Sequence, residues 1–262
     1  MSGSLLERGR QGEALAGVGM IDVHGHLGRT NFCIPDLSPR SLVAAMDRIG
    51  VASVICSPIR VFGTHVEVGN REVLKAATAF PGRILGYVGL HPADTREARA
   101  EAERYLDRGF VGIKLHNSSG FSYTDAGYAE ALAAANERRM ILLLHCWGKE
   151  EEFAEARQLS AAYPDLSIIL AHTGSQREDG YVKIAHECEN VHLDLCLSLS
   201  RRGLVERLVA GAGVEKVLWG SDALFLSMTH QVGKVLGARL SEDEKVQVLA
   251  GNARRLLDRI QR

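Results

Sequence analysis

The chain has 262 residues, of which 46% are hydrophobic, and its 31 basic and 32 acidic residues give a formal net charge of -1. This length suits one α/β barrel domain, and the balanced, interspersed charge excludes the basic surface that nucleic-acid binding requires. No apolar run approaches the roughly 20 residues of a membrane span, so we expect no membrane partner.

The cysteines and the first residues bear on location and boundaries. The five cysteines are an odd number and contain no CxxC pair, which predicts a reduced, cytoplasmic protein. Residues 1–19 carry charges throughout and lack the apolar segment of a signal peptide. We therefore interpret residues 1–19 as a loosely ordered N-terminal extension and expect a single domain over residues 20–262.

From residue 20 onward, short apolar runs alternate with amphipathic, alanine-rich stretches. The eight apolar runs are predicted strands at 20–24, 52–57, 83–90, 111–116, 140–147, 166–172, 191–197 and 216–222. The stretches between them are predicted helices at 38–50, 70–80, 95–109, 128–139, 149–163, 176–189 and 201–213. Near-continuous apolar strands that alternate with helices indicate a parallel sheet covered on both faces. Eight such units predict an α/β fold, the (β/α)8 or TIM barrel.

An open, doubly wound sheet is the alternative fold, but no glycine-rich phosphate loop follows the first strand. After the eighth strand the pattern is less regular. Residues 241–257 then predict a C-terminal helix, because Ser241 and Glu244 have the spacing of a capping box.

The first predicted strand ends in His24-Gly25-His26. Residues two apart on a strand point to the same side, so both imidazoles face one space. Gly25 keeps the position between them small and lets the backbone bend. Because the carboxyl ends of barrel strands build the active site, this pair predicts a functional centre there.

Other strands end in the same kind of side chain. Strand five ends in His145, strand six in His172 and strand eight in Asp222. Three neutral imidazoles and a carboxylate that converge on one mouth suit Zn²⁺ or a similar divalent ion.

The segments IDVHGH, GIKLH, LLLHCWG, PDLSIILAHTG, LWGSDA and GNARRLL follow one another over residues 20–257. With them the chain resembles the amidohydrolase superfamily of metal-dependent barrel enzymes, and more narrowly its amidohydrolase-2 branch. The resemblance implies that His24, His26, His145 and Asp222 bind Zn²⁺ or another divalent ion such as Mn²⁺, with one ion favoured over two. It also implies that Asp222 handles the proton of the nucleophilic water, and that His172 polarises the substrate or acts as acid or base.

Lys114 on the fourth strand leaves two interpretations open. In two-metal members of the superfamily a strand-four lysine is carbamylated and bridges both ions, and the residue matching His172 binds the second ion. An unmodified Lys114 could instead hold a substrate carboxylate as a point charge, and the branch resemblance favours this. His116, Arg60 and Trp147 are the further residues expected to contact a small-molecule substrate, which Arg60 and Lys114 would suit if it is anionic.

The ligand set leaves the reaction open. The leading interpretation is a metal-dependent hydrolase that uses a metal-activated water on a small amide, cyclic amide or lactone. The alternative is a decarboxylase or hydratase of a small carboxylated substrate, because several amidohydrolase-2 members are such lyases. A metal-bound sensor or scaffold disagrees with the intact ligand set, and a TatD-type nuclease disagrees with strand four, which lacks an acid. Family resemblance alone suggests a homodimer.

Overall fold

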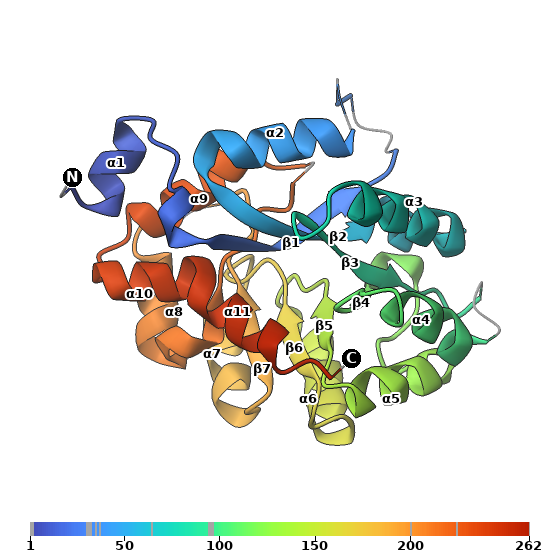
Figure 1. The fold of residues 1–262 in the computed structure, drawn as a ribbon. Coiled ribbons are helices and arrows are strands. Elements are labelled where there is room, and N and C mark those ends of the chain that lie inside the picture. The colour runs from blue at the N-terminus through green and yellow to red at the C-terminus, as the bar shows by residue number, and fades with distance from the viewer. Residues whose placement is uncertain are drawn as a thin grey trace.

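In the computed structural model, eight strands form one parallel sheet in the order β1 to β8 (Figure 1). The structure describes residues 3–29, 33–34, 36, 38–63, 65–93, 97–199, 201–223 and 225–261. The strands are β1 (Met20–Leu27), β2 (Val51–Pro58), β3 (Ile84–Gly89), β4 (Gly112–Leu115), β5 (Ile141–Leu144), β6 (Ser167–Leu170), β7 (Val191–Asp194) and β8 (Val217–Leu218). Each lies within or overlaps one of the eight predicted runs, so the predicted barrel is confirmed.

The segment after β8 closes the barrel against β1. Although β8 itself is two residues long, the backbone that follows it continues along β1. The Val23 amide donates to the Trp219 carbonyl (3.2 Å), the Asp222 amide to the His24 carbonyl (2.7 Å) and the His26 amide to Ala223 (2.7 Å). This pairing brings the first and last strand ends together although they are far apart in the sequence.

Helices connect the strands and cover the outside of the barrel (Figure 1). They are α2 (Pro39–Ile49), α3 (Val66–Ala79), α4 (Ala98–Leu106), α5 (Ala129–Glu137), α6 (Glu150–Ala162), α7 (Glu178–Glu187) and α8 (Leu204–Ala212). Local sequence sets their ends: α2 begins with a Ser38 cap and Pro39 and ends at Gly50, whose φ of 85° suits glycine. None of the described helices has the length and apolar character needed to cross a bilayer.

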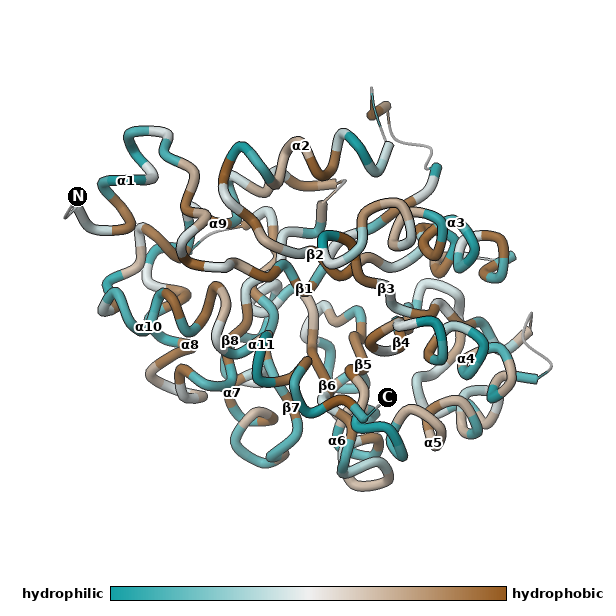
Figure 2. The backbone as a smooth tube through the Cα atoms, viewed as in Figure 1, coloured by the Kyte–Doolittle hydropathy of each residue, from teal (hydrophilic) through white to brown (hydrophobic). Residues whose placement is uncertain are grey.

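The predicted C-terminal helix is present but interrupted. It comprises α10 (Glu242–Val246), a π-helical turn (Gln247–Gly251) and α11 (Asn252–Asp258), and the Ser241/Glu244 capping box is confirmed. Ala253 and Leu256 of α11 join the buried cluster of the barrel interior. The larger cluster lies between the sheet and its helices, and hydrophobic residues follow strands such as β4 and β5 (Figure 2).

The N-terminal segment differs from the expected loose extension. Residues Leu5–Arg10 form helix α1, which begins with a capping box of Ser4 and Glu7. Leu5 and Leu15 are buried in the core, and α1 lies beside α9 (Met228–Leu236) in Figure 1. The charges of this segment suggested disorder, but two buried leucines and the cap are enough to dock it on the barrel.

Candidate active site

A cavity of about 550 Å³ lies at the carboxyl ends of the strands, where barrel active sites are found. Its described lining is rich in aromatic rings and imidazoles: His26, Ile34, Phe62, Lys114, His116, Ser118, His145, Trp147, His172, Asp222 and Phe225. Seven of the residues that sequence patterns assigned to the site therefore share one cavity. His24, which is 1% exposed, lies directly behind His26.

Three of the predicted ligands present their donor atoms to one point. The Nε2 atom of His26 lies 3.0 Å from Oδ1 of Asp222 and 3.2 Å from Nε2 of His24, and the third separation is 3.7 Å. Ligand atoms about 2.0–2.2 Å from a tetrahedral Zn²⁺ ion are roughly 3.3–3.6 Å apart. His24, His26 and Asp222 therefore have the spacing of a divalent-metal site.

Gly25 allows both imidazoles to point the same way. A Cβ atom on Gly25 would lie 2.6 Å from Cγ2 of Val54 and 3.1 Å from Sγ of Cys56. The register between β1 and β2 also shifts between Asp22 and Gly25. The expectation that this position must stay small is confirmed, because β2 leaves no room for a side chain.

Asp22 fixes the turn that carries Asp222. Its carboxylate accepts hydrogen bonds from the His24 amide (3.0 Å) and the Ser221 amide (2.9 Å), and also from the Ser221 hydroxyl. Asp222 and His172 both have a φ of 57°, a left-handed conformation that costs non-glycine residues on the order of 1 kcal/mol or more. Two strained residues in one site indicate that surrounding contacts impose this geometry.

The protonation states favour a cation. Burial lowers the pKa of His24 and His26, so both imidazoles are neutral with lone pairs available. Burial by itself would raise the pKa of Asp222, but the hydrogen bond with His26 and the nearby imidazoles bring it below its ordinary value. Neutral imidazoles beside an ionised carboxylate are the states that metal binding requires.

His145 and His172 form a second pair. Nε2 of His172 lies 3.0 Å from Nδ1 of His145, and the His145 ring stacks on His116 with centroids 3.8 Å apart. The structure does not bring a nitrogen of His145 into the donor group of His24, His26 and Asp222, because its Nδ1 faces His172 instead. Its assignment as a metal ligand stays a prediction.

Lys114 is fully buried beside the donor group. Its Nζ donates to Nε2 of His24 at 3.4 Å, and burial lowers its pKa to about 8. Lys114 is the one lysine or arginine among the described residues that line the cavity. This position suits either a charge for a substrate anion or a second-ion ligand.

Arg60 is not among the described residues that line the cavity, and its assignment as a substrate contact stays a prediction. It lies in the 3₁₀ turn η2 (Ile59–Phe62), where its side chain is exposed, while Phe62 lines the cavity. With three residues per turn, positions two apart point in different directions. The charge of Arg60 was the signal used in the sequence, whereas the residue of this turn that lines the cavity is Phe62.

Aromatic side chains build the cavity wall. Trp147 is 40% exposed and stacks on His172, with centroids 4.8 Å apart and an interplanar angle of 14°. Phe62 lies 4.5 Å from His116, and Phe225 lies 5.4 Å from His26, between ring centroids. Phe62 and Phe225 follow strand ends in the sequence, which is the signal that could have identified them.

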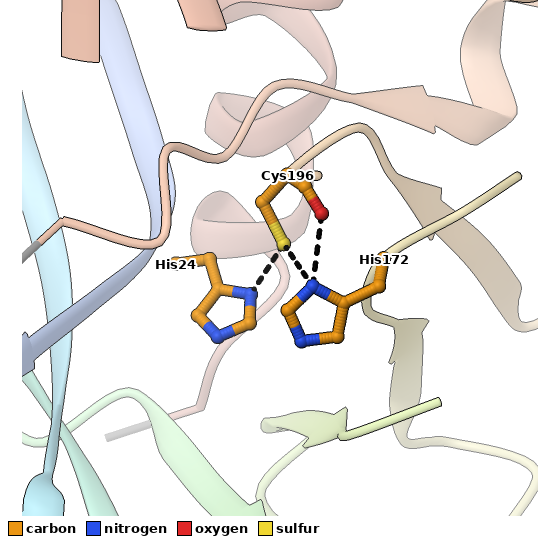
Figure 3. A group of neighbouring side chains, drawn as sticks. All are labelled: His24, His172 and Cys196. Carbon is orange, nitrogen blue, oxygen red and sulfur yellow. Dashed lines mark hydrogen bonds between the residues drawn. The ribbon is translucent and has the colours of Figure 1, made fainter. Parts of the chain in front are cut away.

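The sequence patterns did not identify Asp194 and Cys196, two further side chains at the end of β7. Asp194 accepts from Nδ1 of His24 at 2.8 Å, and Cys196 lies between His24 and His172 (Figure 3). Both are 0% exposed. A carboxylate within the apolar run 191–197 was the available signal, since a buried charge requires a partner.

A family comparison decides what this arrangement belongs to. The amidohydrolase family model matches residues 21–259. The chain belongs to the amidohydrolase family. No curated protein sequence matches this amidohydrolase significantly.

Solved structures share the amidohydrolase barrel. Dihydroxybenzoic acid decarboxylase from Polaromonas sp. JS666, with bound manganese and an inhibitor, has a TM-score of 0.73 and 20% identity, over 92% of this chain and 97% of that one. For 5-carboxyvanillate decarboxylase from Sphingomonas paucimobilis the TM-score is 0.70 and the identity 17%, over 93% of this chain and 100% of that one. A probable 2-pyrone-4,6-dicarboxylic acid hydrolase from Acinetobacter baumannii, with citric acid bound, has a TM-score of 0.70 and 14% identity, over 92% of this chain and 99% of that one. At these identities the likenesses establish the fold.

Proposed function

We propose that this amidohydrolase is a metal-dependent hydrolase of a small cyclic amide or lactone that carries a carboxylate. The observation that supports it best is the double position of Asp222. Its Oδ1 lies 3.0 Å from Nε2 of His26, within the donor group, and its side chain also lines the cavity. A carboxylate so placed is available to both an ion and a substrate.

His24, His26 and Asp222 would hold the ion, with Zn²⁺ and Mn²⁺ as candidates. When bound, such an ion supplies an activated water and polarises the bond to be cleaved. One ion is favoured over two, because the second cluster of donors in the described chain, His24, His172 and Cys196, uses the same imidazole of His24.

The protein's own groups would move the proton. Asp222 is the proposed base that takes a proton from water and passes it to the leaving group. His172 also lines the cavity and is the proposed acid or base next to the substrate oxygen. His145 lies within hydrogen-bonding distance of His172 and would orient its ring.

The wall suggests the shape and charge of the substrate. Phe62, Trp147 and Phe225 offer flat apolar surfaces that suit a planar, unsaturated ring. The Lys114 ammonium group supplies a single cation, which matches one carboxylate. His116, whose ring stacks on His145, is the proposed polar contact beside that carboxylate.

Decarboxylation of a small aromatic acid is the second candidate. The aromatic wall and the lone buried cation favour it, since they would bind a benzoate as well as a lactone. Two of the similar structures are decarboxylases of dihydroxybenzoic acid and 5-carboxyvanillate.

The test is a substrate panel on protein loaded with one metal at a time. Ring carboxylates that contain a lactone or cyclic amide are scored for ring opening, and hydroxybenzoates are scored for CO₂ release. We expect ring opening, with a raised KM in Lys114→Met for carboxylated substrates and an unchanged KM for the matched uncharged ones. CO₂ release without ring opening would establish the second candidate instead, and metal-free protein as active as the loaded form would overturn both.

A further inference from the structure

The end of β7 contacts the site imidazoles from behind. Neither Asp194 nor Cys196 lines the cavity, and both are fully buried. Asp194 Oδ2 lies 2.8 Å from Nδ1 of His24, and the carbonyl of Cys196 accepts from Nδ1 of His172 at 2.9 Å. Figure 3 shows Cys196 against both rings. The two contacts reach the same ring atom, Nδ1, in two different histidines.

The hydrogen bonds of this segment are complete. Asp194 Oδ1 accepts from the Cys196 amide at 2.9 Å, and Oδ2 accepts from the Cys196 thiol at 2.7 Å as well as from His24. With N–H on Nδ1 of both imidazoles, every donor in the group has an acceptor. With N–H on Nε2 of His24 instead, Nδ1 of His24 would present a lone pair to the Asp194 carboxylate, which is unfavourable.

The positions of these protons decide which imidazole nitrogens present a lone pair to the site. A neutral imidazole has one N–H, so a proton on Nδ1 leaves a lone pair on Nε2. Nε2 of His24 is the atom that faces His26 and Asp222. Nε2 of His172 can then accept from Nδ1 of His145, which leaves Nε2 of His145 unprotonated as well.

We propose that Asp194 and Cys196 act as a positioning clamp that holds His24 and His172 in the Nδ1–H tautomer, and that this prepares Nε2 of His24 for a divalent ion. Neither residue touches the ion or the substrate. The inference rests on the metal site of the proposed function and is independent of which reaction the site performs. Carboxylates that accept the second N–H of a ligand histidine orient the ring and raise its basicity.

Gly220 is an independent sign that the chain is built around this pair. A Cβ atom on Gly220 would collide with Oδ1 of Asp194 and lie 2.8 Å from Cβ of His24. A side chain there would displace Asp194, His24 or both, and so disturb their contact. Gly220→Ala therefore disturbs the clamp without changing either of its chemical groups.

A second metal ion held by Cys196, His24 and His172 is the competing explanation of the same cluster. Sγ of Cys196 lies 2.9 Å from Nδ1 of His24 and 2.7 Å from Oδ2 of Asp194. Sulfur and nitrogen ligands of one tetrahedral Zn²⁺ ion are roughly 3.5 Å apart, given bonds of about 2.3 and 2.0 Å. The separation from Sγ to Nδ1 of His172, 3.4 Å, would suit an ion, but the separation to His24 is too short. Nδ1 of His24 also meets Asp194 and Nδ1 of His172 meets the Cys196 carbonyl, so N–H groups at these atoms leave no lone pair for a second ion.

The test measures metal affinity and tautomer without any substrate. Dissociation constants for Mn²⁺ and Zn²⁺ are obtained by chelator competition for the wild-type protein, Asp194→Asn and Gly220→Ala. We expect Asp194→Asn to weaken binding about 10- to 100-fold, and Gly220→Ala to weaken it in the same direction. In metal-free protein, ¹⁵N NMR should find the His24 proton on Nδ1 in wild type and on Nε2 in Asp194→Asn, because the amide can donate to Nδ1.

His192→Gln is the matched control. It lies on the same face of β7, two residues before Asp194, and should leave metal affinity and the His24 tautomer unchanged. A loss of affinity in this control equal to that of Asp194→Asn would show general damage and overturn the clamp. Asp194→Asn is nearly isosteric, and its folding is checked by its thermal melt; Gly220→Ala supplies the same test should that variant fail to fold.

The remaining outcomes separate the clamp from the site itself. Wild-type protein that binds no divalent ion would remove the proposed function and the clamp together. Wild-type binding with unchanged affinity and tautomer in both variants would remove the clamp alone. Two equivalents of Co²⁺ with thiolate-to-metal absorption, reduced to one equivalent in Cys196→Ser, would replace the clamp by the second-ion explanation.

Discussion

His192 and Asp194 lie on the same face of β7, two residues apart, yet their surroundings are opposite. Asp194 meets the N–H of His24 and the amide and thiol of Cys196. Nδ1 of His192 is buried and has no hydrogen-bond partner in the described chain. Asp194 is therefore fully paired within the candidate site, whereas the buried, unpaired Nδ1 of His192 at the amino end costs stability.

The charges at the two ends also differ. Near the carboxyl end, the carboxylates of Asp194 and Asp222 face imidazoles. At the amino end, the charges that act on His192 come from Lys216, Arg255 and Arg259. Negative charge therefore accompanies the candidate metal donors, while burial, assisted by positive charge, lowers the pKa of the other histidine.

The largest expected effect is the loss of turnover in Asp222→Asn. Removal of the carboxylate that handles the proton should lower kcat by roughly 10²- to 10⁴-fold while changing KM much less. Steady-state kinetics on metal-loaded protein measure both constants, and His192→Gln at the opposite end should retain wild-type values. Near-normal turnover in Asp222→Asn would contradict the mechanism.

Acid stability probes the amino end. Burial, together with Lys216, Arg255 and Arg259, lowers the pKa of His192 from 6.5 to about 3. At this group the unfolded chain therefore binds more protons between those values, so the contribution of His192 to the free energy of unfolding is full above pH 6.5 and is lost as the pH drops toward 3. At about 1.4 kcal/mol per pKa unit, the loss from this group is on the order of 5 kcal/mol.

Urea titrations at several pH values measure this loss. His192→Gln should lose less stability between pH 6.5 and 3 than the wild type does, whereas His186→Gln, at an exposed position of α7, should match the wild type. Equal slopes in wild type and His192→Gln would show that another group controls acid unfolding.

Metal addition should stabilise the carboxyl end. A divalent ion at 100 times its Kd should raise the free energy of unfolding by about 2.7 kcal/mol, since it binds the folded chain. Thermal melts with and without the ion measure the shift, and His26→Ala should abolish it. A shift that persists in His26→Ala would place the ion elsewhere.

The smallest effect is expected at the cavity mouth. Trp147→Ala removes the ring that stacks on His172 and should raise KM by a factor of a few, corresponding to about 1 kcal/mol. Trp147→Phe should recover most of the loss. Arg60→Gln, which alters an exposed side chain outside the cavity lining, should leave KM unchanged; a raised KM in this variant would restore Arg60 as a substrate contact.

Much of the barrel could be predicted from the sequence because its signals are local. Apolar runs of strand length alternate with amphipathic stretches, and Ser241 with Glu244 marks a helix start. His24 and His26 share a face because strands repeat every two residues. These patterns depend on neighbours along the chain, so they survive without knowledge of the fold.

Contacts between strand ends were decided by the tertiary structure. Asp194 meets His24 across 170 positions of sequence, and Asp222 approaches His26 because the segment after β8 pairs with β1. Likewise Phe62 turns into the cavity where Arg60 was expected. Such contacts depend on the register and closure of the barrel and on rotamers chosen during packing, and local periodicity carries none of that information.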